Sequence, residues 1–255
     1  MARDSMSIIQ HLEELRRRLI WSVLALLAAT TAAFSYSSRL LGLILGPVIA
    51  PIEQAGGTIT YLHITEGLML QFQLALYAGL VIASPVLGYQ IIAFILPGLT
   101  RKERGYIWFY LPAAALLFVV GVTLSYLIFL PYAVRFLVSF GSPGIKTLVS
   151  VRSLLGFVVS FVLPFGLIFE LPLVVALLTR LGLLSSRILS RIRKYAILVV
   201  FIVAAILTPP DVVSQFAMAL PLYALFEVSI LVSKFVERRL RREKARLEEQ
   251  DRAES

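Results

Sequence analysis

The stretch SLLGFVVSFVLPFGLIFELPLVVALLT, residues 153–179, decides the fold class, because it is long enough to cross a bilayer and carries one charged residue, Glu170. Similar apolar stretches lie on both sides of it, so the sequence predicts an all-α membrane protein with six transmembrane helices. The expected spans lie near residues 19–38, 67–96, 106–132, 153–179, 195–208 and 212–233. The fifth and sixth helices are expected to be short, since residues 195–208 extend only about 21 Å as a helix.

The composition supports a membrane protein. Of the 255 residues, 59% are hydrophobic and 15% charged, and the mean hydropathy is +0.88. These values exclude a soluble globular domain, a disordered chain and a collagen-like fibre. The chain has no Cys, which excludes disulfides, zinc–thiolate sites, iron–sulfur clusters and thiol nucleophiles.

The basic residues indicate the topology. All but four of the 24 Lys and Arg residues lie in the N-terminal tail, the loops after the second and fourth spans, and the C-terminal tail. By the positive-inside rule, both termini are expected to face the cytoplasm. The net charge of +9 is therefore a topology signal, and no nucleic-acid partner is expected. We expect a single transmembrane domain over residues 1–236 and a charged cytoplasmic tail over 237–255.

Two acidic residues lie among basic residues on the expected cytoplasmic side. Glu14 belongs to an amphipathic helix before the first span and is also spaced for an i,i+4 pair with Arg18. Glu103 follows Thr100 in a Thr-x-x-Glu capping box for the third span. Both acids thus have structural explanations, but carboxylates in such a place also suit a visiting guanidinium ligand, which binds through paired, charge-assisted hydrogen bonds.

Glu170 is the candidate functional residue inside the membrane. An ionisable residue in a span costs about 2.5 to 3.5 kcal/mol on insertion scales, so it is expected to face protein, water or a partner. A protonated Glu170 that only hydrogen-bonds within the bundle is the structural alternative. No nucleophile elbow, phosphate loop or metal-binding pattern is present in the sequence, so no enzyme, catalytic residue, cofactor or metal is expected.

Several motifs, in order, resemble the TatC family of the twin-arginine protein translocase. They are His11-Leu12-x-Glu14-Leu15-Arg16-x-Arg18-Leu19, Ser84-Pro85-Val86-x-x-Tyr89-Gln90, Phe94-x-x-Pro97-Gly98-Leu99, Glu103-Arg104, Phe169-Glu170-Leu171-Pro172 and Leu207-Thr208-Pro209-Pro210-Asp211-x-x-Ser214-Gln215. Each motif is weak alone. Their order and their placement on a six-span topology make the combination specific.

The resemblance implies a concave, glove-shaped bundle that recognises Arg-Arg signal peptides of folded proteins at the cytoplasmic face. Glu14 and Glu103 match the acids that line the signal-binding site, with Arg16 nearby. Glu13 is an additional acid of this chain and is included in the expected site. Gln73 stands where many relatives carry Lys.

The resemblance also implies partners and an energy source. Small single-span proteins of the TatA and TatB type are expected to dock near Glu170, and Pro209, Pro210 and Asp211 are expected to form a functional outside turn. The chain is expected in the cytoplasmic membrane, in a homo-oligomeric assembly that uses the proton gradient to export folded proteins. The competing functions are a proton- or ion-coupled small-molecule transporter that uses Glu170, an intramembrane hydrolase and a membrane scaffold.

Overall fold

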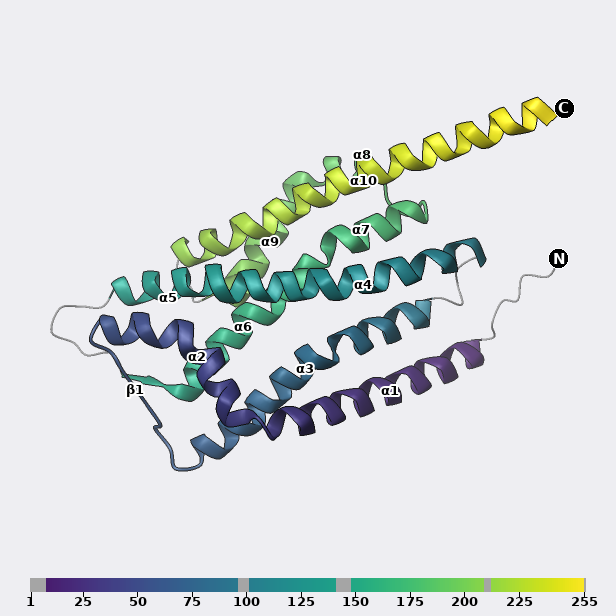
Figure 1. Cartoon of the computed structure of the whole chain (residues 1–255). Helices are drawn as coiled ribbons and strands as arrows, with labels where there is room; N and C mark the ends of the chain where they lie inside the picture. Colours follow the sequence, from purple (N-terminus) through teal and green to yellow (C-terminus); the bar gives the residue numbers. More distant parts are fainter. Residues whose placement is uncertain (1–7, 96–100, 141–147, 209–211, 255) are drawn as a thin grey trace.

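A computed structural model of the chain shows a bundle of long helices that run roughly side by side (Figure 1). The structure describes residues 8–95, 101–140, 148–208 and 212–254. The α-helices are α1 (Ile8–Phe34), α2 (Ser37–Gln54), α3 (Glu66–Ile95), α4 (Arg101–Leu124), α5 (Leu130–Ser139), α6 (Val151–Phe169), α7 (Leu171–Arg180), α8 (Ser186–Arg191), α9 (Arg193–Leu207) and α10 (Val212–Glu254). A π-helical turn, η2 (Ser125–Phe129), joins α4 to α5, and the two short strands are β1 (Thr58–Thr60) and β2 (Leu148–Ser150).

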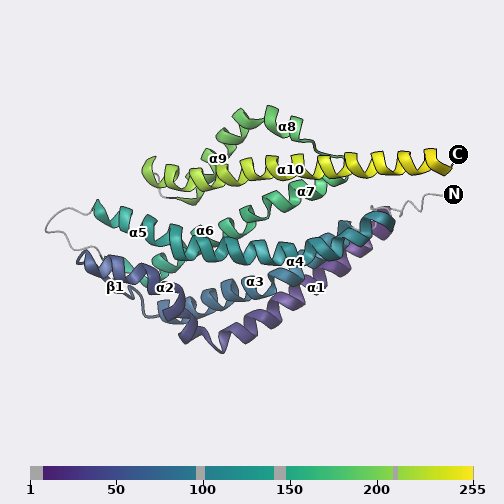
Figure 2. The ribbon, with the colours of Figure 1, turned by 45° about the horizontal axis from the view of Figure 1, so that its top comes forward.

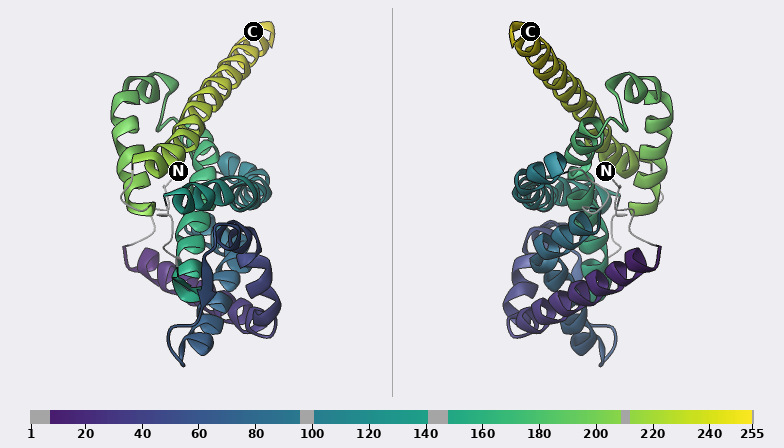
Figure 3. Two further views of the ribbon diagram at one scale, coloured as in Figure 1. Left: turned by 90° about the vertical axis from the view of Figure 1, so that its left-hand side faces the viewer. Right: turned by 90° about the vertical axis from the view of Figure 1, so that its right-hand side faces the viewer.

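The start of α1 and the end of α10 lie at the same end of the bundle, which we call the terminal end (Figures 1 and 2). The opposite end, here the loop end, holds α2, β1, β2 and α5. Viewed along the bundle, α8, α9 and α10 form one edge and α1, α2 and α3 the other (Figure 3).

Five segments within the described residues are long and apolar enough to cross a membrane. They are residues 9–34, 66–94, 110–139, 151–180 and 218–250. Large apolar side chains on their surfaces are exposed, as on Leu19 and Leu27 of α1, because hydrocarbon rather than water surrounds them. These segments overlap five of the six expected spans in order, and the apolar helix α9 lies at the place of the expected short fifth span. The third runs further than expected, through η2 and α5.

The fifth helix is short because two prolines follow it. Thr208, directly before Pro209, adopts an extended backbone with φ −108° and ψ 157°, as the ring of a following proline favours. α9 therefore ends at Leu207, close to the predicted boundary. The prediction of a short sixth helix was wrong. The apolar part of α10 ends near Ser233 as expected, but the charged tail continues the same helix to Glu254 without a break.

The fourth span is two helices rather than one. α6 ends at Phe169 and α7 begins at Leu171, with Glu170 between them. Pro172 has no N–H with which to bond the carbonyl of Ile168, so the helical ladder is interrupted at this turn. Backbone bonds from Leu173 and Val174 to the Glu170 carbonyl, at 3.0 and 2.9 Å, start the second helix.

α2 was not predicted, because Pro47 and Pro51 in residues 37–54 are typical of a loop. The helix tolerates Pro47 because the freed carbonyl of Leu43, four residues earlier, accepts a hydrogen bond from the hydroxyl of Tyr126. Tyr126 lies in η2, on the third span. A contact between segments distant in sequence thus replaces the missing backbone bond.

The main core lies around α6 at the loop end and in mid-bundle. Its large, fully buried side chains come from five helices: Leu45 and Val48 of α2, Leu70 and Leu74 of α3, Leu130 of α5, Leu155 and Phe165 of α6, and Met218 of α10. Ala204 of α9 is buried in the same cluster. A second, smaller cluster joins α7, α8 and α10 through Val175, Leu189, Phe226 and Ile230. The first half of α10 therefore packs into the same bundle as the other spans.

Candidate functional site

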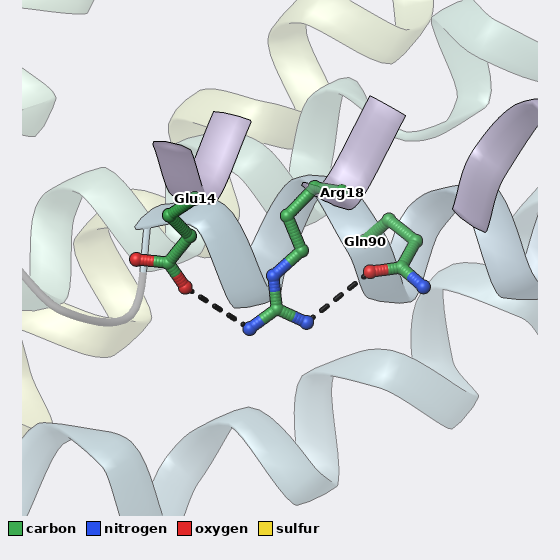
Figure 4. A network of polar contacts seen from close by, with 3 residues as sticks. All are labelled: Glu14, Arg18 and Gln90. Carbon is green, nitrogen blue, oxygen red and sulfur yellow. Dashed lines mark hydrogen bonds and ion pairs between the residues drawn. The ribbon is translucent and has the colours of Figure 1, made fainter. Parts of the chain in front are cut away.

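The first candidate site lies at the terminal end, between α1 and α3. Glu14 and Arg18 are one turn apart on α1 and face Gln90 of α3 (Figure 4). Arg18 Nη2 donates to Glu14 Oε1 at 3.1 Å, and Arg18 Nη1 donates to Gln90 Oε1 at 3.2 Å. His11, one turn before Glu14, stacks on Phe94 with ring centroids 4.4 Å apart. Residues of three quoted motifs, one on α1 and two on α3, therefore meet at one site.

The Glu14 carboxylate is shielded from solvent, and only one of its two oxygens has a hydrogen-bond partner among the described residues. Its side chain is 10% exposed, and that of Arg18 is 22% exposed. Glu14 Oε2 and Arg18 Nε are buried and have no hydrogen-bond partner among the described residues. A shielded acceptor without a partner is unfavourable by about 1 to 3 kcal/mol, so Oε2 is ready to accept a further donor.

A close helix crossing holds the two sides of this site together. α1 packs along α3, and at Gly79 the backbones approach so closely that an added Cβ would lie 2.5 Å from Thr30 Oγ1 and 2.7 Å from Thr30 Cα. Only glycine fits at this distance. Gly79 therefore fixes the spacing between the helix that carries Glu14 and the helix that carries Gln90.

The other residues predicted for this site are only partly placed. Glu13 and Arg16 are exposed on α1, on turns next to Glu14. Glu103 lies in the first turn of α4, but its side chain, like residues 96–100 before the helix, lies outside the described part. The i,i+4 pair between Glu14 and Arg18 is confirmed. Gln90 belongs to a quoted motif, but its contact with Arg18 was missed, because a contact between two helices leaves no local sequence signal.

The second candidate site is the turn at Glu170, in the middle of the fourth span. Glu170 is half-buried and lies where the helical ladder is interrupted. Close packing surrounds it: an added Cβ on Gly121 of α4 would lie 2.7 Å from the ring of Phe169, and one on Gly166 would lie 2.8 Å from the ring of Phe118. The two glycines let α4 and α6 approach each other next to this carboxyl group. The predicted turn Pro209, Pro210 and Asp211 lies outside the described residues.

Sequence reasoning missed an acidic residue at the loop end. Glu66 begins α3 and is only 3% exposed. Its carboxylate accepts the backbone N–H groups of Leu62 at 2.6 Å, His63 at 3.2 Å and Arg152 at 3.0 Å, and the hydroxyl of Ser150. β1 and β2 pair in parallel beside it, with Thr60 opposite Ser150. An acid at the start of an apolar span was the only signal for this cluster.

A second missed acid is Glu237, in the tail part of α10. It accepts the backbone N–H of Ser186 at 2.8 Å and the Ser186 hydroxyl at 2.7 Å, and so caps the start of α8. Glu227, on the same helix, pairs with Arg193 at 2.8 Å and accepts a hydrogen bond from the hydroxyl of Tyr223. Both contacts hold the connection between the fourth and fifth spans, at Ser186 and Arg193, against α10.

Comparisons with known proteins identify the family. The sequence model described as "Sec-independent protein translocase protein (TatC)" matches residues 10–221. The chain belongs to the TatC family. It is 39% identical to the Sec-independent protein translocase protein TatC of Carboxydothermus hydrogenoformans, over 92% of this chain and 96% of that protein. It is 33% identical to TatCy of Bacillus subtilis, over 96% and 95% of the two chains.

The fold agrees with the family as well. The chain matches a crystal structure of the twin-arginine translocase receptor TatC with a TM-score of 0.79 and 35% identity, covering 89% of this chain and 99% of that one. The predicted all-α membrane fold and the role in protein translocation are thereby confirmed. A TatC protein is a transport component and not an enzyme, and the small-molecule transporter is not supported.

Proposed function

We propose that this TatC-family chain is the signal-peptide receptor of a twin-arginine translocase, and that Glu14 binds one arginine of the Arg-Arg pair. The observation that supports this most strongly is that Glu14 already holds a guanidinium, that of Arg18, with one oxygen while its second oxygen has no described partner. The site thus fits the chemical group that a twin-arginine signal presents.

Glu103 is the proposed partner for the second arginine. It lies in the first turn of α4, whose start is at the terminal end like that of α1 (Figure 2). Glu13 and Arg16 border the same site on exposed turns of α1. Two carboxylates matched to two guanidinium groups give recognition by both charge and geometry, which Lys residues reproduce poorly because each offers only a point charge.

The orientation that this function needs follows from the charge distribution. With the terminal end in the cytoplasm, the basic tails and loops lie inside, as the positive-inside rule requires. The signal peptide then approaches from the side where folded precursors are made, and its apolar part inserts along a concave face of the glove-shaped bundle. The protein lies in the cytoplasmic membrane with both termini inside.

Glu170 is proposed as the docking position for single-span partners of the TatA and TatB type. A half-buried carboxyl group at an interrupted helix, in the middle of a span, supports this because such a group needs a polar partner inside the membrane. Pro209, Pro210 and Asp211 are proposed to form the outside turn that the assembly needs. Several copies of the chain are proposed to assemble, and the proton gradient drives export.

Photo-cross-linking tests the receptor function. A signal peptide with a photoreactive residue beside its arginine pair is expected to cross-link to the wild-type protein in membranes. The double variant Glu14→Ala/Glu103→Ala is expected to lose the cross-link while it remains inserted and monodisperse. Glu53→Ala, an exposed acid at the loop end, is the control and should cross-link normally. Unchanged cross-linking in the double variant would contradict the proposed site.

A further inference from the structure

Arg18 occupies the position that the proposed function assigns to a ligand. Its guanidinium contacts Glu14 Oε1 at 3.1 Å from the same helix, one turn away. A ligand guanidinium that approaches Glu14 therefore meets a carboxylate that already has an internal partner. Because both residues belong to α1, Arg18 is always close enough to pair with Glu14.

The internal pair is weaker than the pair that a ligand can form. Arg18 donates from one Nη to Glu14 and from the other Nη to Gln90, so each contact is a single hydrogen bond. Glu14 Oε2 and Arg18 Nε are left without described partners. An incoming guanidinium can donate two parallel bonds to both carboxylate oxygens, which is the stronger arrangement. Displacement of Arg18 is thus favourable for such a ligand.

Gln90 provides a place for the displaced side chain. Its Oε1 accepts from Arg18 Nη1 on the side away from Glu14 (Figure 4). Arg18 can release Glu14 and keep this bond, so its guanidinium is not left buried without a partner. The exchange then breaks one hydrogen bond of the receptor and forms two with the ligand.

We infer that Arg18 is an internal competitor for Glu14 and lowers the affinity of the receptor for every cationic peptide by one common factor. This inference rests on the proposed function. A ligand cation that contacts both oxygens of Glu14 must displace Arg18 from Oε1, so its apparent affinity falls by the fraction of the receptor in which Arg18 is away, whatever the ligand. Peptides whose basic segments bind the receptor weakly therefore dissociate from it, whereas Arg-Arg signals remain bound. The preference for Arg over Lys comes from Glu14 itself.

Peptide binding to the protein in nanodiscs tests this inference. The probes are two fluorescent signal peptides, identical except for Arg-Arg or Lys-Lys, measured by anisotropy at one salt concentration. Arg18→Gln is expected to tighten the binding of both peptides by about three- to tenfold and to leave the ratio of their Kd values unchanged. The matched control is Arg17→Gln, which removes the same charge from an exposed position on the same helix.

The result that overturns the inference is an Arg18→Gln variant that binds either peptide no tighter than Arg17→Gln. Arg18→Lys is a second variant, used in case Arg18→Gln fails to fold. Its ammonium group keeps a cation beside Glu14 but cannot donate to Glu14 and Gln90 through one planar group. It is expected to bind with an affinity between those of the wild type and Arg18→Gln, and an affinity at or below wild type would also count against the competitor.

Glu14→Gln separates this inference from the proposed function. If Glu14→Gln weakens Arg-Arg binding and Arg18→Gln fails to strengthen it, the receptor site stands and only the competitor is wrong. If Glu14→Gln has no effect on Arg-Arg binding, the proposed site itself is wrong.

Discussion

The carboxylate of Glu66 accepts the backbone N–H of Arg152 at 3.0 Å, which joins the segment before the second span to the start of the fourth. Ser150 adds its hydroxyl to the same carboxylate and also accepts the N–H of Ser153 at 3.3 Å as the cap of α6. One buried acid therefore fixes the relative position of two connections at the loop end.

Replacement of Glu66 is expected to destabilise the protein strongly. Glu66→Ala removes the acceptor of the part-buried N–H groups of Leu62 and Arg152, which is expected to cost about 1 to 3 kcal/mol. Thermal unfolding in detergent should show a midpoint several degrees lower. Glu53→Ala, an exposed acid at the same end, is the control and should unfold like the wild type. An unchanged midpoint for Glu66→Ala would mean that the cluster contributes little.

A single methyl group at Gly79 is expected to separate α1 from α3. Its Cβ would lie 2.8 Å from the backbone nitrogen of Thr30, which cannot move without the helix. Gly79→Ala should therefore cost about 1 to 3 kcal/mol and weaken peptide binding, because Glu14 and Gln90 lose their spacing. Gly88→Ala on the same helix meets nothing within 4 Å and is the matched control. Equal stability of the two variants would contradict the tight crossing.

Loss of the cap from Glu237 is expected to loosen α8. Glu237→Ala removes the acceptor for the Ser186 N–H, and loss of such a hydrogen bond costs about 0.5 to 1.5 kcal/mol, while Ser185 still caps α8 by accepting the Ile188 N–H. Hydrogen exchange of the amides in residues 186–191 should accelerate, while that of α9 stays unchanged. Glu248→Ala, an exposed acid further along α10, serves for comparison. Wild-type protection of α8 in Glu237→Ala would show that the cap is dispensable.

The proposed docking role of Glu170 predicts a selective defect. Glu170→Ala should reduce the amount of single-span partner that co-purifies with the protein, and cross-linking to the signal peptide should persist. Ser160→Ala, an exposed polar position on the same span, should recover the partner at the wild-type level. Full recovery with Glu170→Ala would return this residue to a packing role.

The spans could be predicted from the sequence because the bilayer selects for length and hydropathy, which are local properties. Thr208 before Pro209 likewise sets the end of α9 locally. The fold at the loop end could not be predicted in this way. α2 forms despite Pro47 because Tyr126, on another span, satisfies the carbonyl of Leu43. No window of sequence around Pro47 contains that contact.

The contact within α1 at the candidate site was predictable from the sequence, but the contact between α1 and α3 was not. Glu14 was identified from its basic surroundings, and its pair with Arg18 from helical spacing. The role of Gln90 depends on the crossing at Gly79, which brings α3 against α1. The sixth helix was expected to be short because its apolar part ends near Ser233, although a charged helix can continue into water without a change in backbone.

The proposed receptor function depends on recognition of the guanidinium group of a twin-arginine signal by Glu14. The most direct test is the ratio of Kd values for the Lys-Lys and Arg-Arg peptides, measured on the wild-type protein and on Glu14→Gln in nanodiscs. We predict that the wild type prefers the Arg-Arg peptide by about tenfold or more, since a paired guanidinium–carboxylate contact is stronger than a single one, and that Glu14→Gln loses this preference. An equal ratio in both proteins would contradict the claim.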